Sequence, residues 1–247
     1  MRIYLVIVLV AVNLQSYAFT LNGNFKNGWT GPTLKVNVNL TNCPSGFLSA
    51  FQDAADLWNT VSTSFLKIEL GSTSSTTTPA ALIGVTAADS PVIVCDNSFQ
   101  ATTGGDEDSV AGVGFSSVAG GSHLSYGGVI LNTSSGLASI NSMNKEEMSI
   151  VIAHELGHAL GFGHSADNAA LMYFNASYKE DLRLSQDDWD AMTYLYPRNE
   201  LSGDDLLACG ELHSNLTIPP WIYLMLLTPV GVWFYFKQRN LKPTALN

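Results

Sequence analysis

The distribution of apolar side chains along the chain predicts a mixture of strands and helices. In residues 33–40, Leu34, Val36, Val38 and Leu40 alternate with polar residues, which is the pattern of a half-buried strand. Residues 65–70 repeat this period of two, and short apolar runs elsewhere indicate further strands. These further expected strands are residues 81–86, 91–95, 110–116 and 127–132.

Three segments have helical spacing. In residues 47–61 apolar side chains recur every three or four positions. A second helix is expected to begin after Asn144, which can form a capping box with Glu147, and to end at Gly161. A third covers residues 185–196 and is closed by a proline. The Ser/Thr run at residues 72–78 is expected to be a loop, and residues 97–109 are polar and carry three acidic side chains.

Composition and charge restrict the class of protein. Apolar residues make up 46% of the 247 positions, enough to bury a core, whereas charged residues make up only 13%. That share is about half of what is usual in soluble proteins, which indicates that part of the chain lies in lipid. The 21 acidic residues exceed the 11 basic ones, and all of them lie between Asp53 and Glu211. Such a surface repels phosphate backbones, so nucleic-acid binding is excluded.

The two ends of the chain predict export and anchoring. Residues 1–18 have the layout of a secretory signal peptide cleaved after Ala18, although an uncleaved anchor is an alternative. Residues 218–236 contain no charge, have aromatic side chains at both edges and are followed by a basic tail, residues 237–247. This pattern predicts a transmembrane segment or, alternatively, a C-terminal sorting signal that is cut.

The expected organisation is therefore a globular domain at residues 19–198 and a polar stalk at residues 199–217 before the apolar segment. The three cysteines all lie in the part that would be exported, where disulfides persist. We expect Cys43 to pair with Cys95 and Cys209 to remain a free thiol in the stalk. Three reduced thiols are the alternative.

A cluster of histidines carries the strongest chemical signal. The segment HELGHALGFGH holds three of the chain's five histidines within eleven residues. His154 and His158 lie four positions apart and therefore on one face of a helix. Gly161 and Gly163 allow the chain to turn back, so that His164 can reach the same metal ion. Three neutral imidazoles leave one coordination position open, which is typical of catalytic zinc.

Glu155 follows the first histidine and supplies a carboxylate beside the expected ion. Zinc lowers the pKa of a water molecule and polarises a carbonyl group, while Glu155 can accept the proton of the attacking water as general base. The same side chain can then protonate the departing amine. This combination predicts hydrolysis of peptide bonds without a covalent intermediate.

The motif resembles HExxHxxGxxH of the metzincin metallopeptidases. Ser165 and the string Ala-Leu-Met-Tyr at positions 170–173 are similar to the matrixin branch, which contains the matrix metalloproteinases. LSQDDWDAMTYLYP, at positions 184–197, resembles the C-terminal helix of their catalytic domains. The resemblance implies an α+β zincin fold. It comprises a twisted, mostly parallel five-stranded sheet with an edge strand, an active-site helix, a Met-turn and a C-terminal helix.

The resemblance also implies roles for residues outside the histidine motif. Met172 would be the methionine beneath the zinc, and Tyr173 would shape the pocket for the side chain after the cleaved bond. Substrate would lie antiparallel to an edge strand at residues 110–115. Matrixins usually have proline after this tyrosine, but here the residue is Phe174, so pocket specificity does not carry over.

Three comparisons with the matrix metalloproteinases affect the expected metal ions and the control of activity. Matrix metalloproteinases hold a second zinc through histidines on strands that match 110–115 and 127–132, and these segments contain none. We therefore expect one zinc per chain, with His123 a loop histidine. Calcium is a further ion that the resemblance allows, with oxygens from the acidic run 106–108. Only 14 residues separate Ala18 from the first strand, and none is a cysteine, so we expect no cysteine switch.

The sequence thus predicts an exported, monomeric zinc metalloendopeptidase that acts on extracytoplasmic proteins or peptides. It would be membrane-anchored with the catalytic domain outside, or secreted after C-terminal processing. Two alternatives stay open: a surface module of zincin fold that binds a partner without broad proteolysis, and a metzincin peptidase of narrow specificity.

Overall fold

A five-stranded sheet forms the centre of the fold. The computed structural model describes residues 19–23, 25, 27–84, 90–175 and 179–198. The strands are β1 (Thr33–Asn39), β2 (Lys67–Leu70), β3 (Val92–Asp96), β4 (Gly112–Ser117) and β5 (Tyr126–Asn132). Their order in the sheet is β2-β1-β3-β5-β4, and every neighbouring pair is parallel except β4 with β5. The predicted mostly parallel sheet with an edge strand is confirmed.

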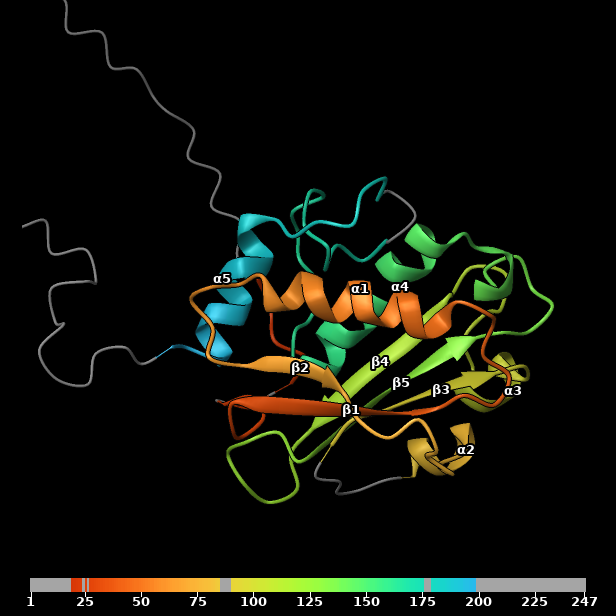
Figure 1. Cartoon of the computed structure of the whole chain (residues 1–247), viewed down its shortest axis with the longest axis horizontal. Helices are drawn as coiled ribbons and strands as arrows, with labels where there is room; N and C mark the ends of the chain where they lie inside the picture. The colour runs from red at the N-terminus through yellow and green to blue at the C-terminus, as the bar shows by residue number, and fades with distance from the viewer. Residues whose placement is uncertain (1–18, 24, 26, 85–89, 176–178, 199–247) are drawn as a thin grey trace, which may run out of the picture. The chain divides into compact units, whose positions relative to one another are not determined.

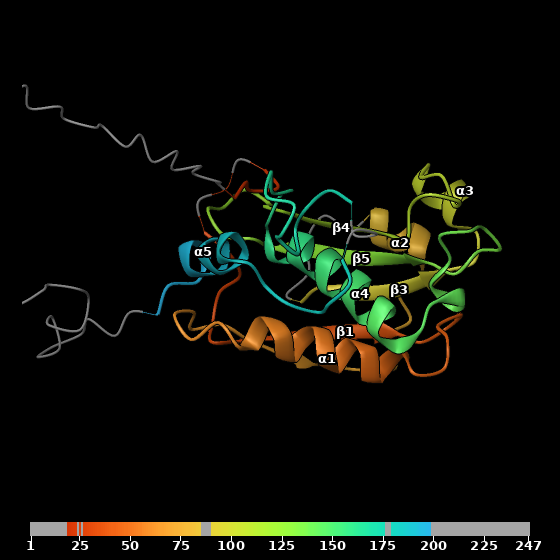
Figure 2. The same ribbon diagram turned by 90° about the horizontal axis from the view of Figure 1, so that it is seen from above.

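Two long helices cover one face of this sheet. They are α1 (Phe47–Asn59) and α4 (Lys145–Leu160), which pack against each other in Figures 1 and 2. Their apolar side chains form the main core together with one set of strand residues, including Val36, Ile93 and Val129. The third long helix, α5 (Gln186–Leu195), contributes Met192 to the same core. The predicted α+β architecture therefore places α4 in the interior.

The opposite face of the sheet is covered by two short helices. They are α2 (Pro79–Ile83) and α3 (Phe99–Thr103), which bury Leu82 and Phe99 against Val92 and Val94. Successive residues of β3 thus belong alternately to the two cores. This arrangement explains why β3 is an uninterrupted apolar run, because both of its faces are covered.

One expectation about this second face is wrong. Residues 81–86 are not a strand, since residues 79–83 form α2. The hydroxyl of Thr78 accepts a hydrogen bond from the backbone N–H of Ala81, and Pro79 occupies the first helical position, where its fixed φ favours a helix. In the polar segment 97–109, α3 forms around the single buried anchor Phe99.

The helix that carries the histidine motif begins and ends where the sequence predicts. The side chain of Asn144 accepts hydrogen bonds from two backbone N–H groups, and the carboxylate of Glu147 accepts one from the backbone N–H of Asn144. The helix stops at Gly161, which has a φ of 107°, a conformation that glycine adopts without strain. A single-turn 3₁₀ helix, η1 (Ile140–Ser142), precedes α4.

Cys43 and Cys95 form a disulfide, as expected, with their Cα atoms 5.2 Å apart. The bond joins the segment before α1 to β3. Several other predictions fall outside the described residues: the signal peptide at 1–18, the stalk at 199–217 with Cys209, the apolar segment at 218–236 and the basic tail at 237–247. Within the described part of the chain, every helix is too short or too polar to cross a bilayer.

Replacing Cys43 with serine tests the contribution of the disulfide. The bridge closes a loop with a sequence separation of 52, so its loss should lower the free energy of unfolding by about 4 kcal/mol. Urea unfolding of Cys43→Ser and of the wild-type chain measures the difference. Cys209→Ser serves as the control and should leave both the stability and the disulfide unchanged. Equal stability of Cys43→Ser and the wild type would contradict the prediction.

Candidate metal centre

Three histidines from two segments converge at the C-terminal end of α4. His154 and His158 lie on successive turns of the helix, and His164 follows the turn that begins at Gly161. One ligand atom from each lies within 4.8 Å of the others, and this is the group of potential metal ligands found among the described residues. The ring centroids are 4.9, 5.5 and 4.8 Å apart. The fold therefore brings together the three residues expected from the sequence.

Backbone carbonyls fix the rings of the two helical histidines. Nδ1 of His154 lies 2.8 Å from the carbonyl oxygen of Leu171, and Nδ1 of His158 lies 2.7 Å from that of Phe162. Because a carbonyl only accepts, each Nδ1 must carry the proton. Each Nε2 is then left with a lone pair, which is the form of histidine that binds a metal.

Burial keeps the histidines neutral. It lowers the pKa of both His154 and His158 to about 4, and it lowers the pKa of the more exposed His164 as well. At neutral pH none of the three imidazoles needs to lose a proton before it binds a cation. Three neutral nitrogen donors without a cysteine are the donor set of catalytic zinc, so the trio fits a zinc site.

Glu155 is buried between α4 and the edge strand β4. Burial raises the pKa of its carboxyl group, whereas His158 and a hydrogen bond from the backbone N–H of Gly114 lower it. A Cβ atom on Gly112 would lie 2.8 Å from Cγ of Glu155. One on Gly114 would lie 2.2 Å from the backbone oxygen of Glu155. Both positions in β4 therefore require glycine, which lets the strand approach the helix closely.

Among the residues that the structure describes, the edge strand β4 pairs with another strand on one side only. β4 pairs antiparallel with β5 through the register Gly114 with Val129, and it is the last strand in the order of the sheet. The sequence placed this edge at residues 110–115, and the strand covers Gly112–Ser117. The outer edge of β4 lies next to the helix that carries Glu155, so an extended peptide could add to the sheet there.

Met172 packs against α4 at Gly157, which lies between the two helical histidines in the sequence. Its side chain is buried, and a Cβ atom on Gly157 would lie only 2.2 Å from its sulfur. Its backbone oxygen accepts a hydrogen bond from the N–H of Ser165, which joins it to the segment after His164. Tyr173 follows, half-buried, with its ring 4.5 Å from that of Phe174.

A buried carboxylate holds the turn at residues 170–173, which contains Met172 and is called the methionine turn below. The oxygens of Asp188, at the start of α5, accept hydrogen bonds from the backbone N–H groups of Leu171, Met172 and Ser185 at 2.7, 3.0 and 2.8 Å. Burial raises the pKa of Asp188, and these donors oppose that shift. Since Leu171 in turn receives the hydrogen bond of His154, Asp188 is connected to the centre through the backbone.

The other sequence candidates do not join the trio. His123 lies in the loop before β5, with Nδ1 3.2 Å from the hydroxyl of Ser122. In the acidic run, the carboxylate of Asp106 accepts hydrogen bonds from the N–H of Asp108 and the hydroxyl of Ser109. Asp108 accepts one from the N–H of Leu137. Asp106 thus closes its own loop, Asp108 joins this loop to the segment of Leu137, and a calcium site there stays a prediction.

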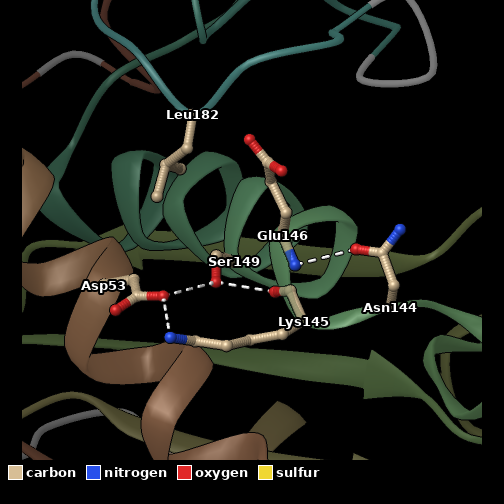
Figure 3. A pocket seen from close by; sticks show the side chains of 6 residues that line it. All are labelled: Asp53, Asn144, Lys145, Glu146, Ser149 and Leu182. Atoms are coloured by element: carbon tan, nitrogen blue, oxygen red, sulfur yellow. Dashed lines mark hydrogen bonds and ion pairs between the residues drawn. The ribbon is translucent and has the colours of Figure 1, made fainter.

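Figure 3 shows a hollow near the N-terminus of α4, and none of its lining residues is a histidine. Its volume is about 520 Å³, and an ion pair of 2.6 Å between Lys145 and Asp53 crosses it. The hydroxyl of Ser149 donates to the backbone oxygen of Lys145. Both charged partners are partly exposed to solvent, and the two acidic residues that line the hollow, Asp53 and Glu146, belong to no group of potential metal ligands among the described residues. We therefore assign it no chemical role.

Sequence reasoning missed the residues that support the centre. Gly112 and Gly114 carried a readable signal, because two glycines in alternate positions of a strand indicate that another segment approaches its backbone. Asp188 gave only a helix-capping signal, since its other partners lie 16 and 17 residues away in the sequence.

The fold and the three-histidine centre define the class as an α+β protein with a site of the catalytic-zinc type. The family model for the matrixins matches residues 48–197, and the chain belongs to this family. It is 54% identical to an interstitial collagenase of Sus scrofa over 50 residues, which is 20% of this chain and 11% of that relative.

Longer matches reach further along the chain. This chain is 33% identical to a neutrophil collagenase of Homo sapiens over 101 residues, which is 40% of this chain and 21% of that relative. The chain is also 33% identical to matrix metalloproteinase-18 of Xenopus laevis over 94 residues, which is 37% of this chain and 20% of that relative. The matches thus span between about a tenth and a fifth of the length of these relatives.

The variant Asp188→Asn tests the support of the methionine turn. An amide would direct N–H groups at backbone N–H donors, so at least one buried donor would lose its acceptor. The free energy of unfolding should fall by about 2 kcal/mol. Asp190→Asn, on the exposed side of the same helix, is the matched control and should change it little. If both variants unfold at the same urea concentration as the wild type, Asp188 does not hold the turn.

Proposed function

We propose that this chain is a zinc-dependent endopeptidase that hydrolyses peptide bonds of extracytoplasmic proteins. The observation that carries the proposal is the convergence of three neutral imidazoles within 4.8 Å, with the carboxyl group of Glu155 on the same helix. Membership of the matrixin family supports it. His154, His158 and His164 would hold the ion, which when bound supplies a Lewis acid for a water molecule and a carbonyl group.

Glu155 is the proposed general base. Its carboxyl group lies in a buried site where burial raises its pKa, which brings its proton affinity closer to that of a group working near neutral pH. It accepts a proton from the attacking water and returns it to the leaving amine. The N–H of Gly114 fixes the carboxylate during this exchange, and the close packing of β4 keeps bulk water from one side of it.

The open edge of β4 is the proposed binding surface for substrate. An extended peptide that pairs antiparallel with β4 would pass beside Glu155, because the backbone of Gly114 lies against this residue. Main-chain pairing is tolerant of sequence, so this geometry supports cleavage within proteins of varied sequence. Tyr173, which follows the buried Met172, would line the pocket for the side chain after the cleaved bond.

We also propose that the domain works outside the cytoplasm. The disulfide between Cys43 and Cys95 supports this location, because such bonds persist in oxidising compartments and are rare in the cytosol. The leader at residues 1–18 and the apolar segment at 218–236 would direct export and anchoring. Whether the chain stays anchored or is released depends on processing of the second segment.

The variant Glu155→Gln separates catalysis from metal binding. It keeps the size of the side chain but removes the base, so kcat for cleavage of casein should fall by a factor of about 10²–10⁴. Zinc content should remain one ion per chain, as in the wild type. His158→Ala is the companion variant and should lose the metal.

Other outcomes of this comparison would change the assignment. Zinc in the wild type without cleavage of any broad protein substrate would favour a binding module or a peptidase of narrow specificity. Absence of zinc from the wild type would refute the proposed centre.

The proposed export predicts the N-terminal residue of the mature protein. After expression in a secreting host, N-terminal sequencing should find Phe19 as the first residue. Ala18→Arg should retain the leader, because signal peptidases require a small residue before the cut. Mature protein that still begins at Met1 would show that the segment is not a cleaved leader.

A further inference from the structure

The turn between α4 and His164 is held by hydrogen bonds from distant parts of the chain. The last carbonyl groups of a helix have no partner within it. Here the hydroxyl of Ser116, in β4, donates to the carbonyl oxygen of His158 at 2.8 Å. The indole N–H of Trp29 donates to that of Ala159 at 2.8 Å. The phenol of Tyr196 donates to that of Leu160 at 2.6 Å.

Hydrogen bonds continue along the turn itself. The N–H of Asn22 donates to the carbonyl oxygen of Gly161 at 2.8 Å. Thr20 makes two bonds: its carbonyl accepts from the N–H of Gly163 at 2.8 Å, and its hydroxyl donates to the carbonyl oxygen of His164 at 2.7 Å. The backbone that delivers the third histidine is therefore fixed from outside the helix at nearly every residue.

This backbone support matters most for His164. The rings of His154 and His158 each donate to a carbonyl oxygen, and both lie on a rigid helix. In the part of the chain that the structure describes, the ring of His164 has no hydrogen-bond partner of this kind, and the residue is exposed. Its position relative to the other two rings consequently depends on the path of the preceding turn.

Tyr196 is the central member of this support. Its side chain is fully buried, its ring packs edge-on against Phe65 and Phe162, and its oxygen also accepts the backbone N–H of Trp29 at 3.3 Å. A Cβ atom on Gly28 would lie 2.2 Å from the ring, so this glycine provides the space for it. One phenol thus joins the segment before β1, the end of α5 and the end of α4.

We infer that Tyr196 is a positioning residue for the metal centre. Through Leu160 and Trp29 it sets the course of residues 161–163 and thereby the place of His164 beside His154 and His158. The inference rests on the proposed function in so far as these histidines hold the metal. It predicts that the phenol hydroxyl controls how long the metal stays bound and how well the centre turns over substrate.

The variant Tyr196→Phe in the full-length chain tests this role, because it removes only the hydroxyl. Zinc release to a chromophoric chelator should be about 10-fold faster than in the wild type, the lower end of effects seen when support of a metal ligand is lost. For a peptide substrate, kcat should fall by a similar factor while KM changes little. Tyr194→Phe, on the exposed face of α5, is the matched control and should leave both quantities unchanged.

Two further comparisons separate positioning from general loss of stability. Cys43→Ser is expected to weaken the fold elsewhere, and well below its melting temperature its zinc release should match the wild type. Trp29→Phe removes the neighbouring donor to Ala159 and should accelerate release as Tyr196→Phe does. Equal release rates for Tyr196→Phe and the wild type, or faster release in Cys43→Ser as well, would overturn the inference.

The outcomes also distinguish this inference from the proposed function. Zinc release can be measured whether or not the chain cleaves a substrate. Faster release from Tyr196→Phe with an inactive wild type would therefore support positioning and contradict the peptidase assignment. Proteolysis by the wild type, with zinc release and kcat unchanged in Tyr196→Phe, would support the peptidase assignment and contradict the positioning role. A wild-type chain that binds no zinc would refute both.

Discussion

The close approach of β4 to α4 is the constraint on which the centre depends. Without side chains at Gly112 and Gly114, the strand lies against the backbone of Glu155 and against Cβ of His158. This contact encloses the carboxyl group of Glu155 and places a backbone N–H on it. It also leaves the outer edge of β4 next to that carboxyl group. A methyl group at either glycine would displace the helix from the strand and alter both features together.

Burial of α4 determines the electrostatic state of the site. Residues 148–160 are all buried, so this part of the helix has no solvated face on which charged side chains could rest. The two helical imidazoles therefore stay neutral, while the carboxyl group of Glu155 becomes a stronger proton acceptor. The same desolvation acts in opposite directions on the two residue types, because it disfavours the charged form of each. Both shifts suit a centre that binds a cation and transfers protons.

The sequence predicted the parts of the structure that depend on local signals. The capping box of Asn144 and the left-handed stop at Gly161 define α4 from a few adjacent residues, and both are confirmed. The strand predicted at residues 81–86 was wrong because a short apolar run fits a strand or a helix equally well. The N-cap at Thr78 favours the helix. The hydrogen bonds that support the centre could not be predicted from the sequence, for a different reason. Tyr196 and Leu160 lie 36 residues apart, and no periodicity encodes such a pairing.

Because of these long-range hydrogen bonds, the geometry of the three histidines depends on the folding of the whole domain. Its motif occupies eleven residues, yet the turn before His164 is held by Thr20 near the first described residue and by Tyr196 near the last. A short helix and loop cut from the protein would contain all three ligands but none of these donors. The loop would then have to be ordered by the metal itself, at the cost of binding free energy. In the folded domain the packing of the core has already met that cost, which leaves the ion a site arranged in advance.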